Sequence, residues 1–301
     1  MIDRLIDRIR ELNIPTCLGL DTLFSYLPED MRAGVSDPEG AAERMLAFNR
    51  AVTEAVCDLV PAVKVQIACY EQYGLPGLRC FAETLRFCRE KGLIVIADAK
   101  RNDIGSTAEC YARAFLGETE INGRTFEAFP SDFVTVNAYL GSDGLKPFLK
   151  YCGRGKGLFA LVKTSNPSSG ELQDQTFSDG STLYEKTAEL LAGLGADCVG
   201  KYGFSELGAV VGATHPAQAA ALRQKFPGLF FLIPGYGAQG GTARDLAVSF
   251  DGRGLGGIVN SSRGILCAYR QEKYAGLPFD RAARAAVLDM KADLNAAIRM
   301  A

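Results

Sequence analysis

Two carboxylates and one ammonium group follow a single apolar stretch of this 301-residue chain. The stretch 93–97 reads as a buried strand, and Asp98, Lys100 and Asp103 lie just beyond it. Because side chains alternate between the two faces of a strand, Asp98 and Lys100 are expected to point the same way. Charges at the end of a buried strand are costly unless they are paired or perform chemistry. The pattern therefore indicates either a structural ion pair or an acid–base centre.

A glycine-rich motif, Gly235-Tyr-Gly-Ala-Gln-Gly240, follows a later candidate strand and precedes a candidate helix. By itself this spacing would indicate a dinucleotide-binding turn. Too few strands remain after it for such a domain, and the next strand ends without the acid that would hold a ribose. Backbone N–H groups of such loops also bind phosphate, and Gln239 and the guanidinium of Arg263 could join them. We interpret the motif as a phosphate site, with a purely structural turn as the alternative.

Short apolar segments alternate with helical patterns along the whole chain, and no change in composition marks a domain boundary. This repetition predicts a parallel sheet with right-handed crossovers, closed into a single-domain (β/α)8 TIM barrel over residues 1–301. The candidate strands are 17–20, 62–67, 93–97, 133–136, 158–162, 209–212, 229–233 and 256–259. The candidate helices are 45–59, 78–88, 107–116, 183–194, 216–226, 242–249 and 281–300, with Thr107 and Thr242 as N-caps.

In such a barrel, function lies at the C-terminal ends of the strands. Polar residues gather at these ends, namely Asp21, Lys64, Asp98 with Lys100, Asn137, Lys163 to Ser165, Pro234 with Gly235, and Ser262 with Arg263. The polar, glycine-containing segment 165–182 follows strand five and is long for a connection, so we interpret it as a lid over the site, with a disordered insertion as the alternative. The single histidine, His215, is expected to cap or pack.

Composition excludes several classes of protein. A net charge of −2 argues against nucleic acid or an anionic membrane as the main partner, and no apolar run approaches the ~18 residues of a membrane span. The beginning of the chain is an acid-containing amphipathic helix, unlike a signal peptide. Nine cysteines without a C-x-x-C pair, and one histidine, argue against a zinc site or Ser-His-Asp chemistry. We expect reduced thiols and a cytoplasmic location.

These motifs resemble those of the orotidine 5′-phosphate decarboxylase family in its longer bacterial form. The resemblance extends from residues 18–21 to 262–264, and its most specific parts are 98–107 and 234–241. It implies a TIM barrel that decarboxylates orotidine 5′-monophosphate to uridine 5′-monophosphate in pyrimidine biosynthesis. The resemblance and the sequence suggest neither a metal nor an organic cofactor.

The resemblance implies that an array of alternating charges lies at the reacting carbon, formed by Lys64, Asp98, Lys100 and Asp103. Lys100 would protonate C6 of the pyrimidine as carbon dioxide leaves. Asp21, Lys64 and Thr107 would hold the ribose hydroxyls. In this family the residues that match Asp103 and Thr107 reach across a homodimer interface, so two composite sites per dimer are expected.

The remaining substrate contacts implied by the resemblance lie on loops. Ser165 would bond the edge of the pyrimidine, and the loop that begins at Pro234 would grip the 5′-phosphate with Gln239 and Arg263. The sequence assigns no role to Asn137 or to the segment 118–130, which is longer than in compact members of the family.

Two other functions stay open at this stage. Magnesium-dependent sugar-phosphate decarboxylases and aldolases of the same barrel group share the Asp-x-Lys-x-x-Asp spacing. They use an acidic set that includes a glutamate, and none stands at the end of strand two, where Lys64-Val-Gln66 precedes apolar residues. A catalytically silent nucleotide-phosphate sensor is the second alternative, although a sensor would not need Lys100.

Overall fold

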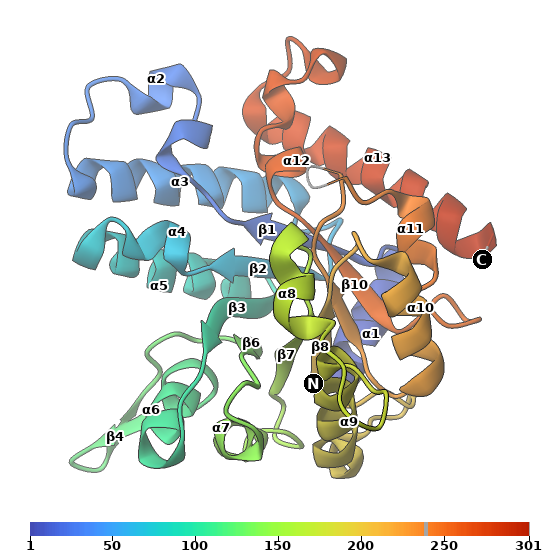
Figure 1. Ribbon diagram of the computed structural model, residues 1–301. Helices are drawn as coiled ribbons and strands as arrows, with labels where there is room; N and C mark the ends of the chain where they lie inside the picture. The colour runs from blue at the N-terminus through green and yellow to red at the C-terminus, as the bar shows by residue number, and fades with distance from the viewer. Residues whose placement is uncertain (238–239, 301) are drawn as a thin grey trace.

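Eight parallel strands form a closed barrel in the computed structural model, which describes residues 1–237 and 240–300 (Figure 1). Around the barrel the order is β1-β2-β3-β6-β7-β8-β9-β10, and β10 pairs with β1. The strands are β1 (Thr16–Leu20), β2 (Ala62–Gln66), β3 (Ile94–Arg101), β6 (Phe133–Val136), β7 (Gly157–Lys163), β8 (Leu207–Val211), β9 (Phe231–Ile233) and β10 (Gly257–Ser261). The predicted TIM barrel is confirmed, and each candidate strand overlaps an observed one.

Helices surround this barrel, and α3 packs between α5 and α13, where the ring of Phe48 stacks on that of Phe279 (Figure 1). The longer helices are α1 (Ile2–Leu12), α3 (Pro38–Val56), α5 (Gly74–Glu90), α6 (Gly105–Leu116), α7 (Ser142–Leu149), α9 (Leu183–Leu194), α10 (Pro216–Lys225) and α13 (Phe279–Met300). The short ones are α2 (Glu29–Arg32), α4 (Ala68–Glu71), α8 (Gly170–Gln173), α11 (Ala243–Ala247) and α12 (Arg263–Leu266). Among the helices described, none is long and apolar enough to cross a membrane.

The amphipathic helix α1 packs against the interior of the barrel. Its buried side chains Ile2, Leu5, Ile6 and Ile9 form one apolar cluster with inward-facing strand residues such as Phe159. This cluster fills the N-terminal end of the barrel, because side chains of that size leave no room for solvent in a close-packed core. The C-terminal end of the strands is left as the place for a site.

Two helix starts test the predicted caps. Thr242 caps α11 as predicted, since its side chain accepts a hydrogen bond from the N–H of Asp245, which bonds back to it. The prediction for Thr107 is wrong, because α6 starts at Gly105 after the extended residue Ile104. Gly105 has φ 54°, a conformation that glycine adopts without strain, and the helix therefore starts earlier than the polar residue suggests.

The two irregular segments of the sequence have defined structures. Residues 118–130 contain the hairpin of β4 (Thr119–Ile121) and β5 (Arg124–Phe126), which extends from the barrel at the lower left of Figure 1. The segment 165–182 contains α8 and then a turn closed by a bridge between Thr176 and Thr182. Its function as a lid stays a prediction.

Arg223 on α10 is buried and bonds to the backbone of the neighbouring segments. Its guanidinium N–H groups donate to the carbonyls of Ser249 (2.9 Å), Pro227 (3.1 Å), Leu229 (2.7 Å) and Gly256 (2.7 Å). Burial lowers the pKa of this guanidinium to about 10. One side chain thus satisfies four carbonyl groups that connect α10 with the segments leading into β9 and β10.

We expect Arg223→Met to destabilise the protein, because an unsatisfied buried acceptor costs about 1–3 kcal/mol and several are created. The expected loss in the free energy of unfolding is at least ~3 kcal/mol, measured by urea denaturation. Arg86→Met is the matched control, since Arg86 makes only an exposed pair with Glu83 and should change stability by less than ~1 kcal/mol. Equal stabilities of the two variants would contradict the role assigned to Arg223.

Candidate functional site

A cavity of about 650 Å³ opens at the C-terminal end of the barrel strands. Its walls come from segments that follow strands on all sides of the barrel, as expected for this fold. The predicted site residues that line it are Asp21, Lys64, Asp98, Lys100, Ser165, Pro234 and Arg263. The structure therefore brings together residues that are up to 242 positions apart, from Asp21 to Arg263.

Asp98 lies between two lysines at the base of this cavity. Lys64 Nζ donates to Asp98 Oδ2 at 2.7 Å and to Asp21 Oδ1 at 3.0 Å. Lys100 Nζ donates to Asp98 Oδ1 at 2.6 Å. Burial alone would raise the pKa of Asp98, but the charges of Lys64 and Lys100 hold it well below its usual value. Burial would likewise lower the pKa of Lys64, and the two carboxylates raise it instead. The charges of Asp98 and Lys64 are therefore present at neutral pH.

The backbone of Lys100 is strained. Its φ of 46° lies in the left-handed region, which costs an ordinary residue about 1–3 kcal/mol. The pairing of β3 with β6 shifts register between Ala97 and Arg101, around this residue. The prediction that Asp98 and Lys100 lie together is confirmed, but regular strand alternation is not the cause. A local irregularity of β3 directs the ammonium group towards the carboxylate.

Two residues that the sequence interpretation missed complete the surroundings of Asp98. Gln66 Nε2 donates to Asp98 Oδ2 at 2.9 Å, and Thr135 Oγ1 donates to Asp98 Oδ1 at 2.8 Å. Thr135 Oγ1 also accepts the N–H of Lys100 at 3.0 Å. The alternation of β2 could have indicated Gln66, which lies two residues after Lys64. No pattern in the sequence singles out Thr135.

Asp21 is held from the other side by β10. Ser262 Oγ donates to Asp21 Oδ2 at 2.8 Å and accepts from Asn260 Nδ2 at 3.3 Å. A Cβ at position 19 would overlap Ser262 Oγ, so the close approach of β1 and β10 requires Gly19. A continuous chain of hydrogen bonds therefore runs from Asn260 through Ser262, Asp21 and Lys64 to Asp98.

The proposed phosphate region lies beside this array. Arg263 is the first residue of α12, separated from the end of β10 by Ser262, and it lines the cavity together with Pro234 and Tyr236. The hydroxyl of Tyr236 donates to Asp293 Oδ2 on α13 at 2.6 Å, which connects the glycine-rich loop to the last helix. Gln239, the other predicted phosphate ligand, lies outside the described residues.

Asp103 and Thr107 do not line the cavity of the single chain. Asp103 Oδ1 accepts the backbone N–H of Ile104 at 2.8 Å. Thr107 is exposed on the first turns of α6. Neither residue is near enough to bond to Asp98 or Lys100 within this chain. Their roles stay predictions, because the single chain does not bring them to the cavity.

Two polar residues at strand ends have structural contacts instead. Asn137 Oδ1 accepts the N–H of Tyr139 at 3.0 Å and stabilises the turn after β6. His215 precedes α10 without a side-chain cap, and its Nε2 lies 3.3 Å from Ser169 Oγ. Burial, and then the charge of Lys163, lowers the pKa of His215. Of the two predicted roles, the His215 side chain therefore packs against its neighbours and does not cap α10.

Across residues 1–237 and 240–300, no group of three or more His, Cys, Asp or Glu side chains is placed to hold a metal ion. The charges at the base of the cavity are instead lysines paired with aspartates. Such an array can stabilise a negative charge that develops on a substrate atom and can supply a proton to it.

Comparison with known proteins agrees with this geometry. Residues 17–275 match the model of the orotidine 5′-phosphate decarboxylase / HUMPS family. The orotidine 5′-phosphate decarboxylase of Clostridium acetobutylicum is 42% identical over 297 residues, which cover 98% of this chain and 99% of the relative. That of Caldicellulosiruptor saccharolyticus is 42% identical over 302 residues, covering 98% of both chains.

Among solved structures, the orotidine monophosphate decarboxylase of Leishmania donovani is similar over the whole chain. It superposes with a TM-score of 0.74 at 30% identity and covers 100% of this chain and 99% of its own. Fold, length and the residues around Asp98 thus lead to one conclusion, which is that this chain belongs to the orotidine 5′-phosphate decarboxylase family.

Proposed function

We propose that this protein converts orotidine 5′-monophosphate into uridine 5′-monophosphate and carbon dioxide, as a step of pyrimidine biosynthesis. The observation that carries the proposal is the Lys64–Asp98–Lys100 array at the base of the cavity. The Lys100 side chain is 44% exposed, whereas that of Lys64 is 5% exposed. Lys100 is therefore the ammonium group that a bound substrate can reach.

The reaction requires a fixed positive charge next to C6 of the pyrimidine. When the bond from C6 to the carboxylate breaks, the electron pair stays on C6 and carbon dioxide leaves. Lys100 stabilises this carbanion and then transfers its proton to C6. Repulsion between Asp98 and the substrate carboxylate contributes about 4 kcal/mol at ~4 Å and an effective dielectric near ~20. Enzymes lower barriers by about 8–23 kcal/mol, so stabilisation by Lys100 is the larger part of the proposed mechanism.

The rest of the cavity binds the remainder of the nucleotide. Asp21 and Lys64 hold ribose hydroxyls, and Ser165 bonds the edge of the pyrimidine. Arg263 grips the 5′-phosphate beside Pro234, with Gln239 as its partner. Binding energy from the phosphate drives closure of the segment 165–182 as a lid over the substrate.

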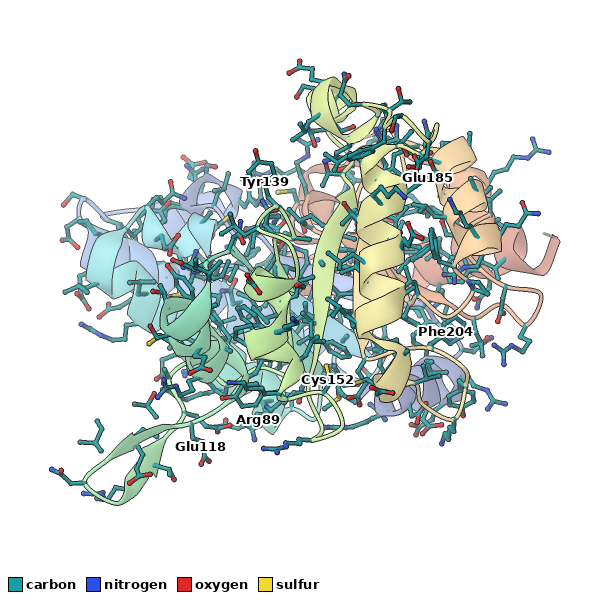
Figure 2. All side chains as sticks on the ribbon, turned by 60° about the horizontal axis from the view of Figure 1, so that its bottom comes forward. Arg89, Glu118, Tyr139, Cys152, Glu185 and Phe204 are labelled. Atoms are coloured by element: carbon teal, nitrogen blue, oxygen red, sulfur yellow. The ribbon has the colours of Figure 1, made fainter. Side chains whose placement is uncertain are left out.

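We propose a homodimer in which Asp103 and Thr107 complete the site of the partner chain. Support comes from large exposed apolar side chains on the segments that follow β2, β3 and β6, because apolar surface of this kind commonly marks an interface. Ile104 is 54%, Leu75 77% and Tyr139 74% exposed, and they follow the adjacent strands β3, β2 and β6. Tyr139 lies at the opposite end of the barrel from Arg89 and Cys152, as Figure 2 shows.

The proposed enzyme needs neither a metal nor an organic cofactor, and we place it in the cytoplasm because its cysteines are free thiols. Addition of a chelator should leave the rate of conversion of orotidine 5′-monophosphate unchanged. Conversion is measured as the loss of substrate absorbance. Loss of activity that magnesium restores would instead support a sugar-phosphate enzyme of the same barrel group. Saturable binding without turnover would support a nucleotide sensor.

We expect Lys100→Ala to lose several orders of magnitude in kcat, because water at that position cannot stabilise and protonate the carbanion. Binding of uridine 5′-monophosphate should persist, measured by calorimetry. Lys150→Ala, which removes an exposed partner of Glu109 away from the cavity, is the matched control and should keep full activity. A Lys100→Ala variant with more than about a tenth of the wild-type kcat, a barrier change under ~1.4 kcal/mol, would refute the role.

Mixing inactive subunits tests the shared site. An Asp103→Ala chain combined with a Lys100→Ala chain should regain activity, since one site of each hybrid dimer contains both intact residues. Random exchange makes about half of the dimers hybrid, so about a quarter of the wild-type activity should return. If subunits exchange, as followed by labelled chains, and the mixture stays inactive, the composite site is wrong.

A further inference from the structure

The proposed mechanism leaves one buried lysine without a task. Lys163 is the last residue of β7, and its side chain is fully buried. Its Nζ donates to Asp174 Oδ1 at 2.7 Å and to Ser169 Oγ at 3.1 Å. Because a buried ammonium group without a partner is strongly unfavourable, this ion pair holds α8 against the barrel.

Gln173, the residue before Asp174, lines the cavity together with Thr164 and Ser165. Gln173 Oε1 accepts the backbone N–H of Thr164 at 2.9 Å, and Gln173 Nε2 donates to Thr164 Oγ1 at 2.8 Å. A backbone N–H only donates, so the first bond determines which end of the amide is oxygen. The carboxamide therefore has a fixed orientation, with its second N–H still available to a ligand.

The geometry of α8 supports a rigid placement. Gly170 allows Asp174 to fold back towards Lys163, since a Cβ at position 170 would lie 2.8 Å from Asp174 Oδ2. Ser169, which bonds to Lys163, also lies 3.3 Å from His215 Nε2 at the start of α10. Contacts from β7 and from the start of α10 thus hold α8 in the position from which Gln173 lines the cavity.

We infer that Gln173 selects the base of the bound nucleotide, and that the Lys163–Asp174 ion pair positions it. This inference rests on the proposed function, which places a pyrimidine nucleotide in the cavity. The available N–H of Gln173 donates to a carbonyl oxygen on the edge of the ring. A uracil-type base offers a carbonyl where cytosine carries an amino group, and two donors facing each other cannot bond. Ligands with the carbonyl are therefore preferred.

The first test compares uridine and cytidine 5′-monophosphate as ligands by calorimetry. The wild type should prefer the uridine nucleotide, and Gln173→Ala should reduce this preference about tenfold, the expected size of one hydrogen bond. Gln175→Ala is the matched control, since Gln175 is exposed, lies outside the cavity and bonds to the carbonyl of Glu171. An unchanged preference in Gln173→Ala, or no preference in the wild type, would overturn the inference.

The second test removes the Lys163–Asp174 ion pair. Asp174→Asn should lower the same preference, whereas Asp179→Asn, which removes an exposed pair with Lys186 in the same segment, should not. The double variant Lys163→Met/Asp174→Asn removes the ion pair without leaving an unpaired buried charge, so the protein should still fold. Its preference for the uridine nucleotide should fall as much as that of Asp174→Asn. Full preference in both variants that remove the ion pair would refute the positioning role.

The two proposals fail separately. If the wild type does not convert orotidine 5′-monophosphate, the proposed function is wrong, whatever the variants bind. If the wild type converts it and Gln173→Ala keeps the full preference for uridine 5′-monophosphate, the base-selecting role alone is wrong.

Discussion

A negative charge inside an apolar barrel is tolerated only when it is fully paired, and Asp98 meets this requirement with four hydrogen bonds. Lys64, Lys100, Gln66 and Thr135 donate them, from strands β2, β3 and β6. Displacing any one of these strands would remove a donor from Asp98 and would incur the energetic cost of an unpaired buried carboxylate. The array around Asp98 therefore depends on a closed barrel in the correct register, so folding and the proposed chemistry rely on the same contacts.

The two ends of the barrel divide the work. The N-terminal end is filled by α1 and by large inward side chains such as Phe159, and it contributes stability. The C-terminal end holds the charge array near β1 to β3, the proposed phosphate region near β9 and β10, and α8 beside β7. A ligand that spans the cavity would touch all three regions at once. Figure 2 places Glu185, at the start of α9, at the same end as Tyr139.

Much of this architecture could be predicted because local patterns determine it. Apolar runs of four to six residues bounded by charges or glycine identify buried strands, and their alternation with helical patterns indicates a parallel barrel. Asp21, Lys64, Asp98 and Arg263 stand directly at or near strand ends, so their gathering in one cavity follows from topology. The N-cap at Thr242 was equally local, whereas that at Thr107 was wrong because the backbone freedom of Gly105 starts α6 earlier.

The sequence by itself determined the fold, the family and the gathering of Lys64, Asp98 and Lys100, because local patterns identify the strands and the charges at their ends. Only the tertiary structure decided how these residues meet. The left-handed backbone of Lys100, the bonds of Thr135 to Asp98 and to Lys100, and the orientation of Gln173 depend on the register between segments. Register is set when the barrel closes and packs, so contacts that depend on it leave no periodic signal in the order of residues.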